Sequence, residues 1–358
     1  MASIIQNRRV PCPPRDHGAI AEPALDEREV RRLLAQREFI ACDARGDVAV
    51  LGGGVSGDVV LASFGATQLV LKRPREQLAV AADWHIDPSR VENEARCLEF
   101  LASILQPGEV PEVVFYDEPS RTLAMRPAPL PRRTWKTQLL AGEVSLQTAE
   151  RVGELLARVH GLSSTHPSVL SQFAWTELLR QGRTDPYHRA VAARHPLLAT
   201  AIEREAQRLE ATHLTLALGD VSPKNIFVYD DHVMFFDVEI AHWGDPAFDV
   251  AFCLTMLVLK SLVVAGRAAE LRAAIDNLWT AYRTAAPVWP ELEEHVLAEL
   301  GCQLLARVDG KSPVEYITDD PTREEVRRIA EAILLRPIVS VAELLDRLRV
   351  GSLAERVK

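Results

Sequence analysis

The sequence predicts an α+β chain in which an antiparallel sheet precedes a mainly helical part. Residues 48–72 alternate short apolar runs with glycine-containing turns, which is the pattern of neighbouring antiparallel strands. From Ser145 onward, by contrast, apolar residues recur mostly at helical spacing. With 358 residues the chain is long enough for two lobes that each bury a core. We expect a loosely ordered segment at 1–25, a first lobe at 26–126 and a second lobe at 127–358.

The first lobe is predicted to begin with an amphipathic helix over Asp26–Ile40, whose acidic first turn matches the helix dipole. Before it, four prolines and the absence of hydrophobic periodicity indicate loose order. Three strands follow within 48–72, and Val110–Tyr116 and Thr122–Met125 complete a five-stranded sheet. A helix from about Pro88 separates the third strand from the fourth. The proline-rich residues 126–133 then form a linker.

A glycine-rich turn at 52–57 joins the first two strands. Gly53, Gly54 and Gly57 permit a ligand to approach the backbone closely, and Ser56 could add a hydroxyl group. Lys72 lies near the end of the third strand, on the far side of this hairpin. Glycine turns and strand-end lysines also occur without a ligand, so the turn alone does not establish a binding site.

The second lobe is predicted to contain a series of helices, the first of them over Thr148–His160. The others lie at Pro186–Leu209, Val250–Val264, Ala268–Ala285, Pro290–Arg307, Thr322–Leu335 and Val339–Leu348. The most apolar piece, residues 250–265, is short and is interrupted by Lys260. We therefore expect a buried helix there and no membrane span.

The stretch Leu214–Phe252 carries the strongest chemical signal. One apolar run is followed by Asp220 and a second by Asp237, and a buried carboxylate needs a paired charge or a bound cation. Asn225 and Glu239 lie close by in the sequence. Carboxylate and amide oxygens of this kind suit Mg²⁺, which leaves room for substrate phosphates. A β-hairpin whose turn carries solvated acids is the alternative explanation.

The spacing D-x-x-x-x-N from Asp220 to Asn225, followed by Asp237 after a further strand, resembles the catalytic and metal-binding segments of protein-kinase-like enzymes. The subsequent GDPAFDVA at Gly244–Ala251 is similar to the small-molecule branch of that group, which holds aminoglycoside phosphotransferases, methylthioribose kinases and choline kinases. The resemblance covers residues 26–348. It implies a protein-kinase-like bilobal fold whose first lobe binds the nucleotide and whose second lobe binds the acceptor.

The resemblance also implies roles in chemistry for individual residues. Asp220 would orient and deprotonate an acceptor hydroxyl. Asn225, Asp237 and Glu239 would hold Mg²⁺ against the phosphates of ATP. Arg307 is a candidate to neutralise the transferring phosphoryl group, and a surface arginine is the alternative.

A further set of residues would bind ATP. These are the turn residues Gly53, Gly54, Ser56 and Gly57 together with Lys72, Glu94 and the backbone just after Met125. Glu94 would form an ion pair with Lys72 as the helix glutamate does in kinases. Glu92 competes for this role, but NEARCLEFL matches the family pattern better with Glu94.

Within the group, methylthioribose kinases are the most similar. They share the D-x-E segment at 237–239, a tryptophan-containing insertion matched at Trp84, and a late segment matched at Ala306–Ile317. Four positions depart from the patterns: Leu218 replaces a histidine, Ser222 a histidine or lysine, Asn225 a serine, and Ala306 the first of two adjacent arginines. These departures concern the identity of the acceptor.

Composition and charge exclude several classes. A net charge of −9 argues against nucleic-acid binding. Five widely separated cysteines without CxxC spacing suit reduced thiols in a cytoplasm, and the amino terminus lacks the apolar core of a signal peptide. We expect a cytoplasmic monomer or homodimer that binds neither nucleic acid nor membranes.

The function predicted from sequence is ATP-dependent phosphorylation of a hydroxyl group on a small metabolite, with Mg²⁺ as cofactor and a methylthioribose-like pentose as acceptor. An aminoglycoside kinase and a choline- or homoserine-type kinase share the same core and stay open. A nucleotide-binding pseudokinase is the alternative from another class. Competent residues at all catalytic positions disfavour it.

Overall fold

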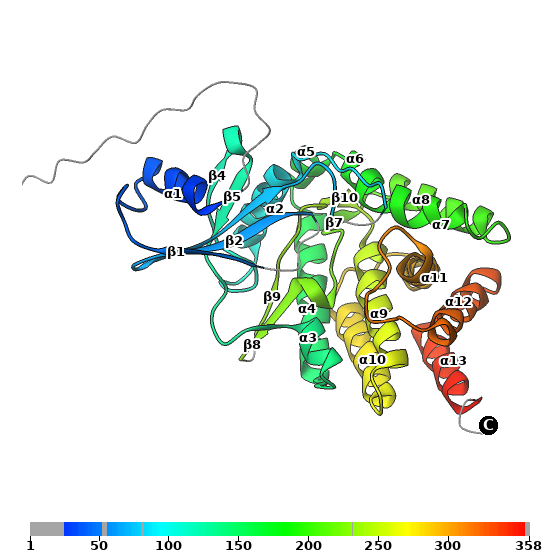
Figure 1. Cartoon of the computed structure of the whole chain (residues 1–358). Coiled ribbons are helices and arrows are strands. Elements are labelled where there is room, and N and C mark those ends of the chain that lie inside the picture. The colour runs from blue at the N-terminus through cyan, green and yellow to red at the C-terminus, as the bar shows by residue number, and fades with distance from the viewer. Residues whose placement is uncertain (1–24, 52–55, 80–81, 231, 355–358) are drawn as a thin grey trace, which may run out of the picture.

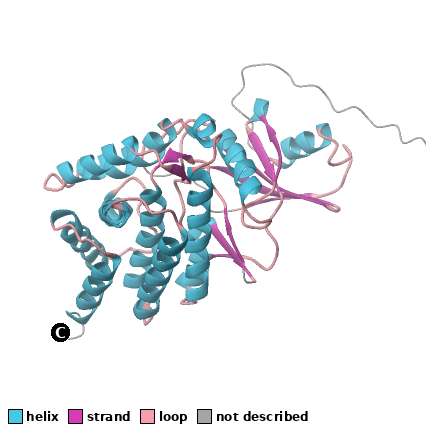
Figure 2. Ribbon diagram, turned by 180° about the vertical axis from the view of Figure 1, so that it is seen from behind, coloured by secondary structure: helices cyan, strands magenta, loops and turns pink. Residues whose placement is uncertain are grey.

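The computed structural model describes residues 25–51, 56–79, 82–230 and 232–354, with side chains up to residue 349. The predictions for residues 1–24 and for Gly53 and Gly54 lie outside these ranges. A five-stranded sheet with its helices occupies one end of the molecule and long helices occupy the other (Figure 1). Figure 2 shows the same division from behind. The predicted lobe boundary after residue 126 falls between the strands β5 and β6.

The large sheet is antiparallel throughout and has the strand order β1-β2-β3-β5-β4. Its strands are β1 (Asp47–Val50), β2 (Gly57–Phe64), β3 (Thr67–Pro74), β4 (Val113–Asp117) and β5 (Thr122–Met125). The prediction of five antiparallel strands is thus confirmed, although β4 begins three residues later than expected. Of the glycine-rich residues 52–57 between β1 and β2, the structure describes Ser56 and Gly57.

Two helices cover opposite faces of this sheet because side chains alternate along a strand. On β3, Leu69 and Leu71 face helix α1 (Glu27–Gln36) and pack in a small separate core. Lys72, the residue after Leu71, therefore faces helix α2 (Arg90–Ile104). The helix α1 ends at Gln36 and not at Ile40, because the chain turns at Glu38, which adopts a φ of 62°. Alternation on β3 thus directs Lys72 toward the helix that carries Glu94.

The helical part begins after β6 (Arg133–Thr134) and follows the predicted series with one correction. Its main helices are α3 (Trp135–Leu140), α4 (Leu146–Ser164), α8 (Ala199–Ala211), α9 (Pro246–Val263), α10 (Ala268–Ala285), α11 (Leu292–Asp309), α12 (Asp320–Leu335) and α13 (Val341–Ala354). Short helices α5 (Val169–Phe173) and α6 (Glu177–Leu179) follow α4. The prediction of one helix over Pro186–Leu209 was wrong. A π-helix, η2 (Arg180–Arg189), runs into α7 (Ala190–Ala192), and the chain then turns at residues 193–198, where Pro196 cannot continue a helix.

The central stretch forms strands of two small sheets instead of one hairpin unit. Strand β7 (Thr215–Ala217) pairs with β10 (His242–Gly244), whereas β8 (Ile226–Tyr229) pairs with β9 (His232–Phe235) and β6. The loop after β7 and the loop after β9 are therefore brought together between the large sheet and the helices. These two loops carry Asp220 and Asp237.

Helix α9 forms the centre of the helical part and packs against α10, α11 and α12. It is the one helix among the described residues that is long and apolar enough to cross a membrane, and 89% of that window is buried inside the protein. Cys253 of this helix is a buried free thiol, as are Cys97 and Cys302. Burial agrees with the expectation of a core helix.

The segment between β3 and α2 connects the sheet to the helical part. The indole Nε1 of Trp84 donates a hydrogen bond to the carbonyl oxygen of Gln181 at 2.9 Å. The ammonium group of Lys311 donates to the carbonyl oxygen of Asp83 at 2.8 Å. Trp84, which the sequence matched to the tryptophan-containing insertion of methylthioribose kinases, is 5% exposed and is held in this contact. Its position makes it a link between the two parts of the fold.

The tight packing of α4 on α10 predicts that Gly153→Ala destabilises the protein. A methyl group there would overlap the carbonyl oxygen of Leu278 on α10, and we expect the free energy of unfolding to fall by about 1–3 kcal/mol through overpacking. Urea unfolding measures the change. Gly161→Ala on the same helix is the control, because the nearest atom to its new methyl group is a proline ring carbon at 3.3 Å. Equal effects of the two substitutions would contradict the packing argument.

Candidate active site

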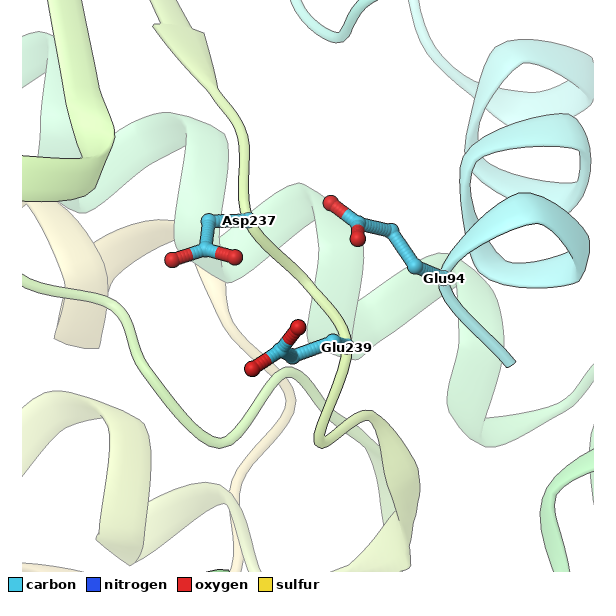
Figure 3. A group of neighbouring side chains, drawn as sticks. All are labelled: Glu94, Asp237 and Glu239. Carbon is cyan, nitrogen blue, oxygen red and sulfur yellow. The ribbon is translucent and has the colours of Figure 1, made fainter. Parts of the chain in front are cut away.

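A buried lysine ammonium group joins three carboxylates from different parts of the chain. The Nζ atom of Lys72 lies 2.7 Å from Glu94 Oε2 and 2.9 Å from Glu239 Oε2, and it also contacts Asp237. Figure 3 shows the three acidic side chains pointing toward one another, Glu94 from α2 and the other two from the segment after β9. The competing Glu92 instead pairs with Arg96. The structure therefore brings together four of the residues predicted from sequence.

The charges of this cluster depend on one another. Burial disfavours the ammonium form of Lys72, but the three carboxylates outweigh it and raise the pKa of Lys72 well above its ordinary value. Partial burial acts to raise the pKa of Asp237, yet Lys72 and Lys224 hold that pKa at about 2. Burial and the adjacent carboxylates together raise the pKa of Glu94 to about 7, although Lys72 acts to lower it. Lys72 is thus charged and Asp237 ionised at neutral pH.

The carboxylate cluster suits a divalent cation. Oxygen atoms of Glu94, Asp237 and Glu239 all lie within 4.8 Å of one another. Carboxylate oxygens are the ligands that Mg²⁺ takes in phosphotransferases. Asp237 also has a φ of 62°, an uncommon conformation for a residue with a side chain and one that clusters at functional sites.

Arg90, which the sequence analysis did not select, connects this cluster to the glycine-rich turn. Its side chain is completely buried, and its Nε lies 3.4 Å from Glu239 Oε1. The same guanidinium group donates hydrogen bonds to the carbonyl oxygens of Ser56 and Ile86. A basic residue in the first turn of a helix opposes the helix dipole, and this local conflict was a signal that could have identified Arg90.

The position of Asp220 is determined by a buried carboxylate in the first turn of α9. Asp249 accepts hydrogen bonds from the backbone N–H groups of Leu218 at 2.6 Å and Gly219 at 2.8 Å, and from His160 Nε2 at 3.1 Å. Gly219 has a φ of 78°, and a Cβ atom there would lie 2.9 Å from the carbonyl oxygen of Ile240. The loop thus requires glycine before Asp220 and a carboxylate beneath it. The leucine at 218, where relatives of the kinase type carry histidine, is buried in the core.

The carboxylate of Asp220 has one oxygen bonded to cations and one without a partner. Oδ2 lies 3.2 Å from Arg183 Nη2 and 3.0 Å from Lys224 Nζ. Oδ1 is buried and has no hydrogen-bond partner among the described residues. The side-chain N–H of Asn225 donates to the backbone carbonyl of Asp220 at 3.1 Å. The backbone carbonyl of Asn225 accepts a hydrogen bond from the backbone N–H of Phe236. Asn225 therefore lies between Asp220 and the residue that precedes Asp237.

Arg307 lies beyond Arg183 and not in contact with Asp220. Both guanidinium groups lie over the ring of Tyr187, with centroid distances of 5.5 Å for Arg183 and 5.8 Å for Arg307. Arg307 also donates to the hydroxyl of Tyr187 at 3.0 Å, and its Nε is buried without a hydrogen-bond partner in the described part of the chain. Arg307 is thus half-buried and is separated from Arg183 by the ring of Tyr187.

The predicted nucleotide-binding residues that the structure describes lie around the same cluster. Ser56 accepts hydrogen bonds from Arg75 and Arg90 through its carbonyl oxygen. Gly57 begins β2, and a Cβ atom there would overlap the backbone of β3. Met125 ends β5 beside Val70, where the chain leaves the sheet.

Comparison with known proteins agrees with this geometry. A model described as the phosphotransferase enzyme family matches residues 47–295, which is more than half of the chain. The chain belongs to the phosphotransferase enzyme family. Methylthioribose kinases of Pectobacterium atrosepticum and Pectobacterium carotovorum subsp. carotovorum are each 25% identical over 274 residues, covering 66% of this chain and 68% of the relative. The family and these relatives identify the chain as a small-molecule kinase.

Solved structures confirm the protein-kinase-like fold. A choline/ethanolamine kinase family protein from Mesorhizobium loti matches with a TM-score of 0.52 and 18% identity, covering 90% of this chain and 99% of that one. An amicoumacin kinase matches with a TM-score of 0.52 and 12% identity, covering 88% and 95%. At these identities the likeness extends to the fold and leaves the acceptor open.

The hydrogen bonds that Asp249 accepts from His160 and from the turn before Asp220 predict that Asp249→Ala is strongly destabilising. Three buried donors lose their acceptor, and breaking a buried charged network typically costs about 3–5 kcal/mol in the free energy of unfolding. Chemical denaturation of both proteins measures the loss. Asp276→Ala on the exposed face of α10 is the matched control, with an expected change within about 0.5 kcal/mol. A loss below about 1 kcal/mol for Asp249→Ala would show that the network is dispensable.

Proposed function

We propose that the protein transfers the γ-phosphoryl group of ATP to a hydroxyl group of a small polyol, with a methylthioribose-like pentose as the acceptor. The observation that carries the proposal is the carboxylate of Asp220. Its Oδ2 is held by two cations while its Oδ1 is buried without a partner. A general base requires an oxygen that is free to accept a hydrogen bond from the acceptor hydroxyl, and Oδ1 of Asp220 supplies one.

The residues around Lys72 bind the other two components of the reaction, ATP and Mg²⁺. Lys72, held by Glu94, fixes the phosphates of ATP, with the backbone of the turn at 53–57 around them. Asp237, Glu239 and Asn225 hold Mg²⁺, which supplies charge neutralisation when bound. As Oδ1 of Asp220 takes the hydroxyl proton, the acceptor oxygen bonds to phosphorus and the bond to ADP breaks. Arg307 contributes positive charge at the acceptor side.

Local charge favours a neutral or anionic polyol over a polycation. Arg183 and Lys224 both contact the base, and Arg307 lies one ring away without a carboxylate partner within 4.0 Å in the described part of the chain. An aminoglycoside or choline would bring like charge to this side of the site, which is unfavourable. The two methylthioribose kinase relatives, together with the shared D-x-E segment, direct the proposal toward a pentose.

The acceptor is tested by coupled ADP release with 5-methylthioribose, ribose, choline and kanamycin as separate substrates. We expect turnover of a pentose with a KM that changes less than about threefold between roughly 50 and 300 mM salt, because recognition by hydrogen bonds is not screened. Capture of a polycation would weaken steeply over the same range. Efficient turnover of kanamycin or choline with no activity on either pentose would contradict the proposed acceptor.

The role of the base predicts that Asp220→Asn lowers kcat by about 10²–10⁴-fold while ATP binding is retained, because the amide occupies the same volume but cannot take a proton. Steady-state kinetics gives kcat, and a thermal shift with ATP and Mg²⁺ reports binding. Asp230→Asn, at an exposed turn of the same stretch, serves as the control. Retention of more than about a tenth of kcat in Asp220→Asn would exclude this residue as the base.

A further inference from the structure

Arg183 occupies the interior of the protein although its local sequence is strongly polar. The segment RQGRTDPYHR forms the π-helix η2, and Arg183 is 5% exposed. Wide π-helical turns are rare and occur frequently at functional sites. Nothing in the periodicity of this segment indicates burial, so the sequence analysis did not select Arg183.

The π-helix is fixed to its surroundings on two sides. His188 Nε2 lies 2.9 Å from Glu299 Oε2 of α11, and both side chains are completely buried. On the other side Arg189 bonds to Glu210 of α8. Burial disfavours the charged form of His188, but Glu299 outweighs it and raises the pKa of His188. Arg183 therefore projects from a rigid element.

The guanidinium group of Arg183 contacts both the backbone and the side chain of the loop that carries the base. Its Nε donates to the carbonyl oxygen of Gly219 at 2.5 Å, and its Nη2 lies 3.2 Å from Asp220 Oδ2. A third nitrogen, Nη1, donates to the carbonyl of Gly182 on the π-helix itself. Because the planar fork of the guanidinium group contacts both backbone and side chain, it fixes the Asp220 carboxylate relative to the backbone of the same loop. The ammonium group of a lysine, which acts as a point charge, cannot do this.

Lys224, the other cation on Oδ2, differs from Arg183 in every respect that matters for positioning. Its side chain is 46% exposed, whereas that of Arg183 is 6% exposed. It follows Asp220 by four residues in the same loop, and within the described part of the chain its ion pair is with Asp220 alone. A flexible, half-exposed chain supplies charge but little restraint on the geometry.

We propose that Arg183 is a positioning residue for phosphoryl transfer: it holds Asp220 Oδ2 so that Oδ1 stays directed at the acceptor hydroxyl. This inference rests on the proposed role of Asp220 as base. Reacting groups must be held near the productive geometry, and a misplacement of about 1 Å costs about 100-fold in rate. Arg183 acts through Asp220 and does not itself touch the reacting atoms.

The test compares Arg183→Met, which removes the fork and the charge, with Arg183→Lys, which keeps the charge alone. The acceptors are 5-methylthioribose and, in its absence, water, so that both transfer and ATP hydrolysis are measured. We expect Arg183→Met to lower kcat for transfer by about 10- to 100-fold with the KM for ATP changed less than about threefold. The ratio of hydrolysis to transfer should rise, because a misaligned base no longer favours the acceptor hydroxyl.

Arg183→Lys separates positioning from charge. If the fork matters, this variant stays at least about threefold below the wild type, and low millimolar methylguanidinium added to Arg183→Ala restores activity better than methylammonium does. Arg204→Met on the exposed face of α8 controls for loss of charge and for effects of the additives. Wild-type kcat and an unchanged hydrolysis ratio in Arg183→Lys would overturn the proposal.

The remaining outcomes also decide the question. If Arg183→Met does not fold, Arg183→Lys and the rescue of Arg183→Ala give the answer. If Asp220→Asn keeps its activity, the proposed base is wrong independently of Arg183. If the wild type turns over neither substrate, crystal structures of the wild type and Arg183→Lys decide: an Asp220 carboxylate in the same position in both would overturn the inference, and a displaced one would support it.

Discussion

The rest of the site depends on the ion pairs between the ammonium group of Lys72 and its three carboxylate partners. Lys72 comes from the central strand of the sheet, and its partners come from α2 and from the loop after β9. Three carboxylates within 4.8 Å of one another would repel strongly without it. The two parts of the chain are thus held together by the charges to which we assign phosphoryl transfer. Arg90 extends this arrangement by connecting Glu239 to the glycine-rich turn.

A second set of buried polar contacts supports Asp220, the proposed base. Asp249 holds the backbone of the turn before Asp220, and Arg183 holds its carboxylate from the π-helix. Asp249 acts on the main chain, and Arg183 acts on both the Gly219 carbonyl and the Asp220 side chain, so the loop has little freedom left. Both supports are buried, where each hydrogen bond is stronger than in water and each unpaired group is more costly. The base is therefore positioned by residues distant from it in the sequence.

Much of the fold and part of the site could be predicted from sequence because their signals are local. Alternating apolar residues and glycine turns predicted the five strands, and apolar periodicity predicted most helices. Lys72, Glu94 and Asp237 were selected from motifs with characteristic spacing. The π-helix, by contrast, has no apolar periodicity and contains a proline, so its existence follows from tertiary contacts such as that of His188 with Glu299. Arg183 was missed for the same reason, since its burial depends on partners far away in the chain. Arg90 was missed although its place in the first turn of a helix was a local signal.

The burial of α9 has a consequence for synthesis of the chain. This helix is apolar on nearly its whole circumference, and α10, α11 and α12, which cover it, all follow it in sequence. During translation its apolar surface therefore leaves the ribosome before any of its covering helices exists. Exposed surface of this kind promotes aggregation. A chain that stops after α9 would lack these covering helices. The carboxy-terminal helices, which supply none of the acidic groups around Lys72, thus shield the apolar surface of the helix that carries Asp249.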